Sequence, residues 1–164
     1  MSTRSTTHFI YGNPKRPEAI VYRHSDGYPA GAGVDLREFL DRCAKLKDPR
    51  LADPSYLAAK YVVFLAEMFN HGDYDPTEGG YKPPVSRLEF ISVGVMSGDP
   101  GDIEYRYVLD CQNLVGGRPR LTCYAVSETY DESTKRDKHW SRWTLTEVPI
   151  PVRRLAPNTT AVAP

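Results

Sequence analysis

Hydrophobic and polar positions in the first part of the chain predict two short strands. Residues 8–12 and 19–24 are rich in β-branched and aromatic side chains, and residues 13–17 between them have the composition of a turn. We therefore expect a β-hairpin that follows a disordered tail over residues 1–7.

Two helices are predicted after the hairpin. Over residues 34–46 apolar side chains recur every three or four positions, which is typical of an amphipathic helix. A proline-containing linker ends this segment, and Ser55 is a suitable cap for a second helix that runs to about residue 70. The second segment is apolar around most of its circumference, so we expect it at the centre of the core.

The second half of the chain is extended in character. Its strand-like segments are residues 88–96, 103–111 and 120–126, and the turns between them predict an antiparallel meander. Residues 127–138 are polar and charged, which indicates a solvated loop or a frayed helix. Residues 139–150 either add one more strand or continue the loop, and residues 151–164 have the composition of a disordered tail.

This order of elements predicts an α+β fold. We expect one domain over residues 8–150, with a mostly antiparallel sheet of about five to six strands and two helices packed on one face, in the order ββααβββ(β).

Length and composition indicate a single domain and argue against two classes of protein, extended nucleic-acid binders and membrane proteins. The chain has 164 residues and a mass of 18.5 kDa, which suits one domain, and its 21 basic residues equal its 21 acidic ones. This balance argues against an extended nucleic-acid footprint, and no apolar run is long enough for a membrane helix. The N-terminus lacks the pattern of a secretory signal, so we expect a cytoplasmic protein.

Neither metal nor cofactor is predicted. Cys43, Cys111 and Cys123 are widely separated within apolar patterns, so we interpret them as buried thiols. The loop over residues 71–84 has carboxylates at alternate positions, but Glu78 and Pro84 occupy positions where a calcium loop requires glycine and an acid.

The glycine-rich turn that leads into the first helix is the main candidate site. Such a turn exposes backbone N–H groups at the positive end of a helix, where phosphate or carboxylate groups bind. The candidate ligand- or partner-binding residues are Arg23, His24, Asp26, Tyr28, Gly31 and Gly33. The glycine patterns of dinucleotide and P-loop sites are incomplete here, and a purely structural strand-to-helix connection is the alternative.

His24 and Asp26 are two residues apart, so in an extended chain they share a face and could form a base and its orienting carboxylate. Ser25 would point to the opposite face. The three consecutive residues therefore do not predict a catalytic triad.

Three motifs carry a resemblance to a known group. They are Tyr-Arg-His-Ser-Asp-Gly-Tyr-Pro-Ala-Gly-Ala-Gly at 22–33, Gly-Gly-Tyr at 79–81 and Gly-Asp-Ile-Glu-Tyr-Arg-Tyr-Val-Leu-Asp at 101–110. Over roughly residues 8–112 the chain resembles a group of small bacteriophage and prophage proteins to which no activity is assigned. The resemblance implies a phage-type accessory protein inside a bacterial cell, where interference with a host system is one role. It supplies no catalytic residues.

Two classes of function follow. In the first, the protein is a binding module that contacts a host protein or a small anionic ligand. In the second, it is a small enzyme that acts on a phosphate-bearing substrate, with Arg23, His24 and Asp26 at the glycine-rich turn before the first helix. We favour binding, because the sequence offers no nucleophile with a nearby base and no complete set of metal ligands. The edges of the predicted sheet would also allow a homodimer.

Overall fold

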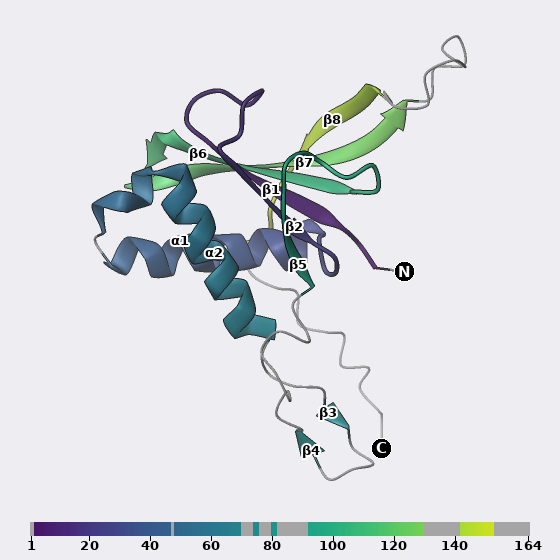
Figure 1. Cartoon of the computed structure of the whole chain (residues 1–164), viewed down its shortest axis with the longest axis horizontal. Coiled ribbons are helices and arrows are strands. Elements are labelled where there is room, and N and C mark those ends of the chain that lie inside the picture. The colour runs from purple at the N-terminus through teal and green to yellow at the C-terminus, as the bar shows by residue number, and fades with distance from the viewer. Residues whose placement is uncertain are drawn as a thin grey trace.

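The computed structural model describes residues 2–46, 48–69, 74–75, 80–81, 92–129 and 142–152. In this part of the chain, six strands form one sheet and two helices cover one of its faces (Figure 1). The strands of the sheet are β1 (Ser5–Ile10), β2 (Ala19–Arg23), β5 (Val93–Met96), β6 (Tyr105–Val115), β7 (Arg118–Thr129) and β8 (Arg142–Val148), and the helices are α1 (Val34–Leu46) and α2 (Pro54–Phe69). Four of the five strand pairs are antiparallel. The predicted α+β class is confirmed.

The hairpin of β1 and β2 is present, but it begins earlier than predicted. All six residues of β1 are buried, from Ser5 onward. Residues 5–7 therefore belong to the sheet and not to a tail. The hydrophobic pattern missed them because Ser5, Thr6 and Thr7 are polar side chains that the sheet buries through its tertiary contacts.

The predicted meander is only partly correct. The strand order is β5-β2-β1-β6-β7-β8, so β6, β7 and β8 are consecutive neighbours, whereas β5 pairs with β2 at the opposite edge. The neighbour of β6 on its other side is β1, which runs parallel to it. Alternation of side chains identifies a strand, but it does not say which strand lies beside it.

The link from β5 to β6 crosses the sheet on the face away from the helices. Its Asp99 carboxylate accepts a hydrogen bond from the Thr6 hydroxyl at 2.6 Å, lies 2.7 Å from Nε2 of His8, and accepts a hydrogen bond from Arg106 at 2.5 Å. These partners alternate along β1 and β6 with the residues that face the helices. The cluster therefore anchors the crossing segment to the two central strands.

The charge of Asp99 is stabilised by this cluster. Burial raises the pKa of its carboxyl, but the hydrogen bonds from His8 and Thr6, together with the charges of His8 and Arg106, outweigh burial and hold the pKa below its usual range.

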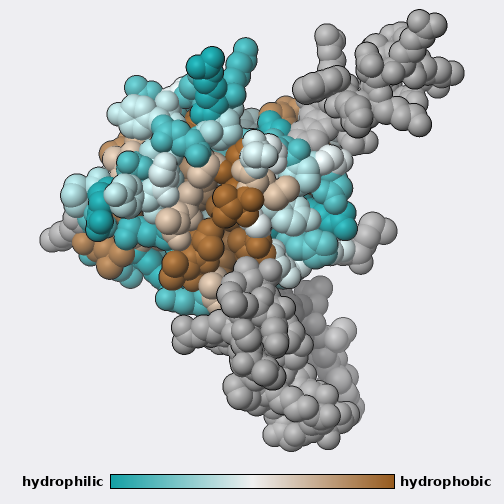
Figure 2. Space-filling view, viewed as in Figure 1, coloured by the Kyte–Doolittle hydropathy of each residue, from teal (hydrophilic) through white to brown (hydrophobic). Residues whose placement is uncertain are grey.

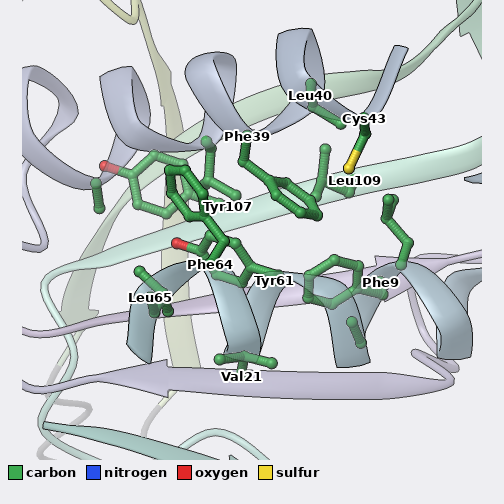
Figure 3. Close-up of a cluster of buried hydrophobic side chains, with 14 of the residues drawn as sticks. Phe9, Val21, Phe39, Leu40, Cys43, Tyr61, Phe64, Leu65, Tyr107 and Leu109 are labelled. Carbon is green, nitrogen blue, oxygen red and sulfur yellow. The ribbon is translucent and has the colours of Figure 1, made fainter. Parts of the chain in front are cut away.

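The core lies between the sheet and the two helices (Figure 3). Aromatic rings from both layers meet there: the ring of Phe39 on α1 lies 5.2 Å from that of Tyr61 on α2, and Tyr61 lies 5.9 Å from Phe9 on β1. Both helices occur where the periodicity predicts them. The cap of α2 is Asp53 and not Ser55, because the Asp53 carboxylate accepts hydrogen bonds from the first backbone N–H groups of the helix at 2.9 and 3.2 Å.

The predictions for the other segments are confirmed in one case and wrong in another. Residues 127–129, predicted as loop or frayed helix, extend β7, and β8 supplies the extra strand considered for residues 139–150. In the predicted loop 71–84 the structure describes only a two-stranded pair, β3 (Tyr74–Asp75) with β4 (Gly80–Tyr81). The rest of that loop lies outside the described residues, as do the start of the predicted strand 88–96 (residues 88–91), residues 130–141 and residues 153–164.

The three cysteines are free and buried, as predicted. Burial raises the pKa of all three thiols, to about 12 for Cys111 and to about 11 for Cys123. The thiols are therefore protonated side chains of the core.

Candidate recognition site

The glycine-rich motif forms a compact connection between β2 and α1. After Arg23 the chain turns through Asp26, whose φ of 55° lies in the left-handed region, and a π-helical turn over Pro29–Gly33 leads directly into α1. We call residues 24–28, between β2 and this turn, the Tyr28 loop. Asp is one of the few side chains that adopt a left-handed conformation readily, which explains its position at the reversal.

Close packing explains the glycines of the motif. A Cβ atom at Gly31 would lie 2.5 Å from the carbonyl oxygen of Asp26. One at Gly33 would lie 2.9 Å from the side chain of Ile150, which packs against the core from beyond β8. Both distances are too short for a real Cβ, so these positions require glycine for packing alone.

Backbone N–H groups of the turn are used within the turn. The N–H of Gly31 donates to the carbonyl of Tyr28, and that of Ala32 donates to the carbonyl of Asp26, each at 2.9 Å. The N–H of Val34 donates to the carbonyl of Gly31. In this conformation these three donors have protein acceptors, so they do not form the anion cradle that the sequence suggested.

Arg23 points into the protein and not toward a ligand. It is 2% exposed, and its guanidinium donates to the carboxylate of Asp35 and to the carbonyl of Ser25, both at 2.7 Å. Asp35 is 1% exposed in the first turn of α1. The buried ion pair therefore ties β2 and the Tyr28 loop to the start of the helix.

Asp35 was missed as part of this site, although one signal was available. Arg23 lies two residues after Val21, so both side chains are on the side of β2 that faces the helices, and a charged group at such a position requires a buried partner. Asp35 is the acidic residue in the first turn of the helix that follows the motif. The pattern could have predicted the pair.

Tyr107 on β6 forms a buried hydrogen bond with the Tyr28 loop. Its hydroxyl donates to the carbonyl of Gly27 at 2.8 Å, and the N–H of Gly27 donates to the carbonyl of Thr3 at 2.9 Å. A Cβ at Gly27 would lie 2.7 Å from the backbone carbonyl carbon of Arg4. Burial raises the pKa of Tyr107, so its hydroxyl stays protonated and available as a donor.

Three side chains of the loop face outward. His24 and Asp26 are exposed, and Tyr28 is 41% exposed. Within the described part of the chain the hydrogen-bond partner of the His24 ring is the Tyr22 hydroxyl, 3.1 Å from Nδ1, and not Asp26. The Ser2 hydroxyl donates to the His24 carbonyl. The pairing of His24 with Asp26 that the sequence allowed is therefore absent from this geometry.

The fold and this site together define an α+β protein with a firmly held, outward-facing loop at the entrance to its first helix. Comparison with protein-family models, with curated proteins and with solved structures finds no match to the chain. Among the described residues, no group of three histidine, cysteine or acidic side chains is placed to hold a metal ion. No helix in the same part of the chain is long and apolar enough to cross a membrane.

Proposed function

We propose that this chain is a phage-type accessory protein that binds a protein of the bacterial host through the Tyr28 loop. The resemblance of residues 22–33 and 101–110 to phage proteins supports the biological setting. The observation that carries the proposal is the support of the loop: buried groups hold it from two sides while His24, Asp26 and Tyr28 face outward.

Such support favours binding because a rigid loop loses little conformational entropy when a partner docks. Tyrosine is enriched among the residues that dominate protein interfaces, since it buries a large apolar ring and keeps a polar group at its tip. Tyr28 combines these advantages, because its side chain is partly exposed and its backbone is held in place by the hydrogen bonds of the loop.

A protein partner suits the loop better than a small anion. The Arg23 guanidinium pairs with Asp35, and the N–H groups of Gly31 and Ala32 bond to carbonyls of the turn. The outward surface instead offers an imidazole, a carboxylate and a phenol, which can form hydrogen bonds with backbone and side-chain groups of another protein.

Affinity capture from the lysate of a bacterial host tests this proposal. We expect the wild-type chain to recover one stoichiometric partner, and Tyr28→Ala to lose it, with affinity reduced about thirtyfold or more, as for an interface hot spot. Tyr11→Ala is the matched control, because Tyr11 is a similarly exposed tyrosine (55%) in a different turn and should retain the partner.

A second variant tests the role of the support. Tyr107→Phe removes the hydrogen bond to Gly27 but leaves every outward-facing side chain in place, so it should weaken binding less than Tyr28→Ala does. An empty capture, or equal recovery by wild type and Tyr28→Ala, would contradict the proposal. A melting temperature of the wild type raised by nucleotides would favour the anionic-ligand alternative instead.

A further inference from the structure

An apolar groove of about 480 Å³ lies between α1 and α2. Phe39, Cys43 and Phe64 line it as buried side chains. Leu46, Tyr56 and Val63 line it with 64%, 50% and 59% of their surface exposed. In Figure 2 the densest hydrophobic patch lies in the middle of the face in view, where Figure 1 places α2 and, beside it, β2 and β5.

The residues along the groove have the spacing of a helix-packing seam. On α2 they include positions 56, 60, 63 and 67, and on α1 positions 39, 43 and 46, so the steps are three and four residues. Side chains at these steps form one row along a helix and receive the row of another helix packed at a small angle. The groove therefore suits an additional helix.

Charges on the α2 row are self-complementary. Lys60 lies three residues before the exposed Val63, and Glu67 lies four residues after it. If a second α2 approaches in the antiparallel direction, about a two-fold axis between residues 63 and 64, Lys60 of each copy faces Glu67 of the other. Such reciprocal contact is the defining property of a two-fold interface.

We propose that the protein forms a two-fold dimer in which α2 of each copy packs against α2 of the other, with Val63 near the axis. The Lys60 ammonium, 3.3 Å from Asp48 of its own chain, has three donors and can reach both carboxylates. Arg42 pairs with Glu38 at 2.6 Å and lies over the Phe64 ring, so it borders the interface without leaving an unpaired charge. The dimer surface shares no residue with the Tyr28 loop.

Exchanging the charges of Lys60 and Glu67 tests the proposed dimer. The full chain is examined by sedimentation velocity and by light scattering over a wide range of concentration, and we expect the wild type to dimerise. Lys60→Glu alone and Glu67→Lys alone place like charges opposite one another twice per dimer, so each should weaken self-association about tenfold or more. The double variant Lys60→Glu/Glu67→Lys restores opposite charges and should recover dimerisation.

Val63→Asp places a carboxylate at the axis and should yield monomers. Leu114→Asp is its control, since Leu114 is similarly exposed (50%) at the far end of β6 and should leave the dimer intact. Circular dichroism checks that each variant is folded. A monomeric wild type at all concentrations, a dimer that persists in Val63→Asp, or a double variant as weak as the single ones would each overturn the proposal.

Discussion

The buried ion pair between Arg23 and Asp35 leads to the most informative stability prediction. Replacing Arg23 with Met keeps much of the apolar length of the side chain but leaves the carboxylate of Asp35, 1% exposed, without the guanidinium 2.7 Å away. Removing one partner of a buried pair usually costs about 3–5 kcal/mol, because the remaining charge stays buried after its ion-pair partner is lost. Asp35→Leu should cost a similar amount for the reciprocal reason.

The double variant Arg23→Met/Asp35→Leu should behave differently. If the single losses were independent they would add to about 6–10 kcal/mol, which is comparable to the total stability of many domains. With both charges removed, neither member of this pair is left as a buried charge. One loss that remains is the hydrogen bond from Arg23 to the Ser25 carbonyl, about 1 kcal/mol. We therefore expect the double variant to be more stable than either single variant.

Urea unfolding followed by circular dichroism measures the three free energies, and a double-mutant cycle gives the coupling between the two positions. Arg42→Ala is the control, because its pair with Glu38 is an exposed i,i+4 pair and should contribute no more than about 0.5 kcal/mol. The reasoning is refuted if the double variant loses the sum of the two single losses. It is also refuted if Arg23→Met costs no more than Arg42→Ala does.

Three further predictions concern Asp99, the buried thiols and Gly27. The lowered pKa of Asp99 means that its contribution to stability is complete above the carboxyl pKa of the unfolded chain, about 3.9, and is lost as the pH falls through the lower folded value. Asp99→Asn should therefore be less stable at neutral pH and lose less on acidification, measured as urea unfolding at several pH values. The three buried thiols should react with a thiol reagent at pH 8 only after denaturant is added, as followed by absorbance. Gly27→Ala should lower the melting temperature by the equivalent of about 1–3 kcal/mol, because its Cβ would meet the backbone of Arg4 at 2.7 Å, and an unchanged transition would contradict this.

The helices and most strands could be predicted because their side-chain periodicity reports which side is buried. Phe39 and Cys43 on α1 are buried as their spacing predicts. The prediction failed for residues 5–7, where polar side chains occupy a strand with both faces covered. The burial of Thr6 depends on the crossing segment that carries Asp99, about 90 residues later in the chain, and Ser5 lies against Gly27. No local pattern reports either contact.

The glycine-rich motif was correctly predicted as a turn before a helix, but the partner of Arg23 was not predicted. Glycine, arginine and histidine before a helix are equally compatible with an anion site and with a tight connection. The direction of the Arg23 side chain decides between them, and it depends on which face of β2 the helices cover. Sequence could indicate that Arg23 needed a partner, whereas the partner itself became visible only in the folded chain.

By itself, the sequence determined the class of fold, the positions of both helices, the hairpin of β1 and β2 and the burial of the thiols. These properties follow from local periodicity and turn composition, which act over a few residues. Tertiary structure decided that β1 lies parallel to β6, that β5 joins the opposite edge, and that Arg23 and His8 find partners 12 and 91 residues away. The physical reason is that strand pairing and buried charge pairs depend on contacts between segments that are distant along the chain.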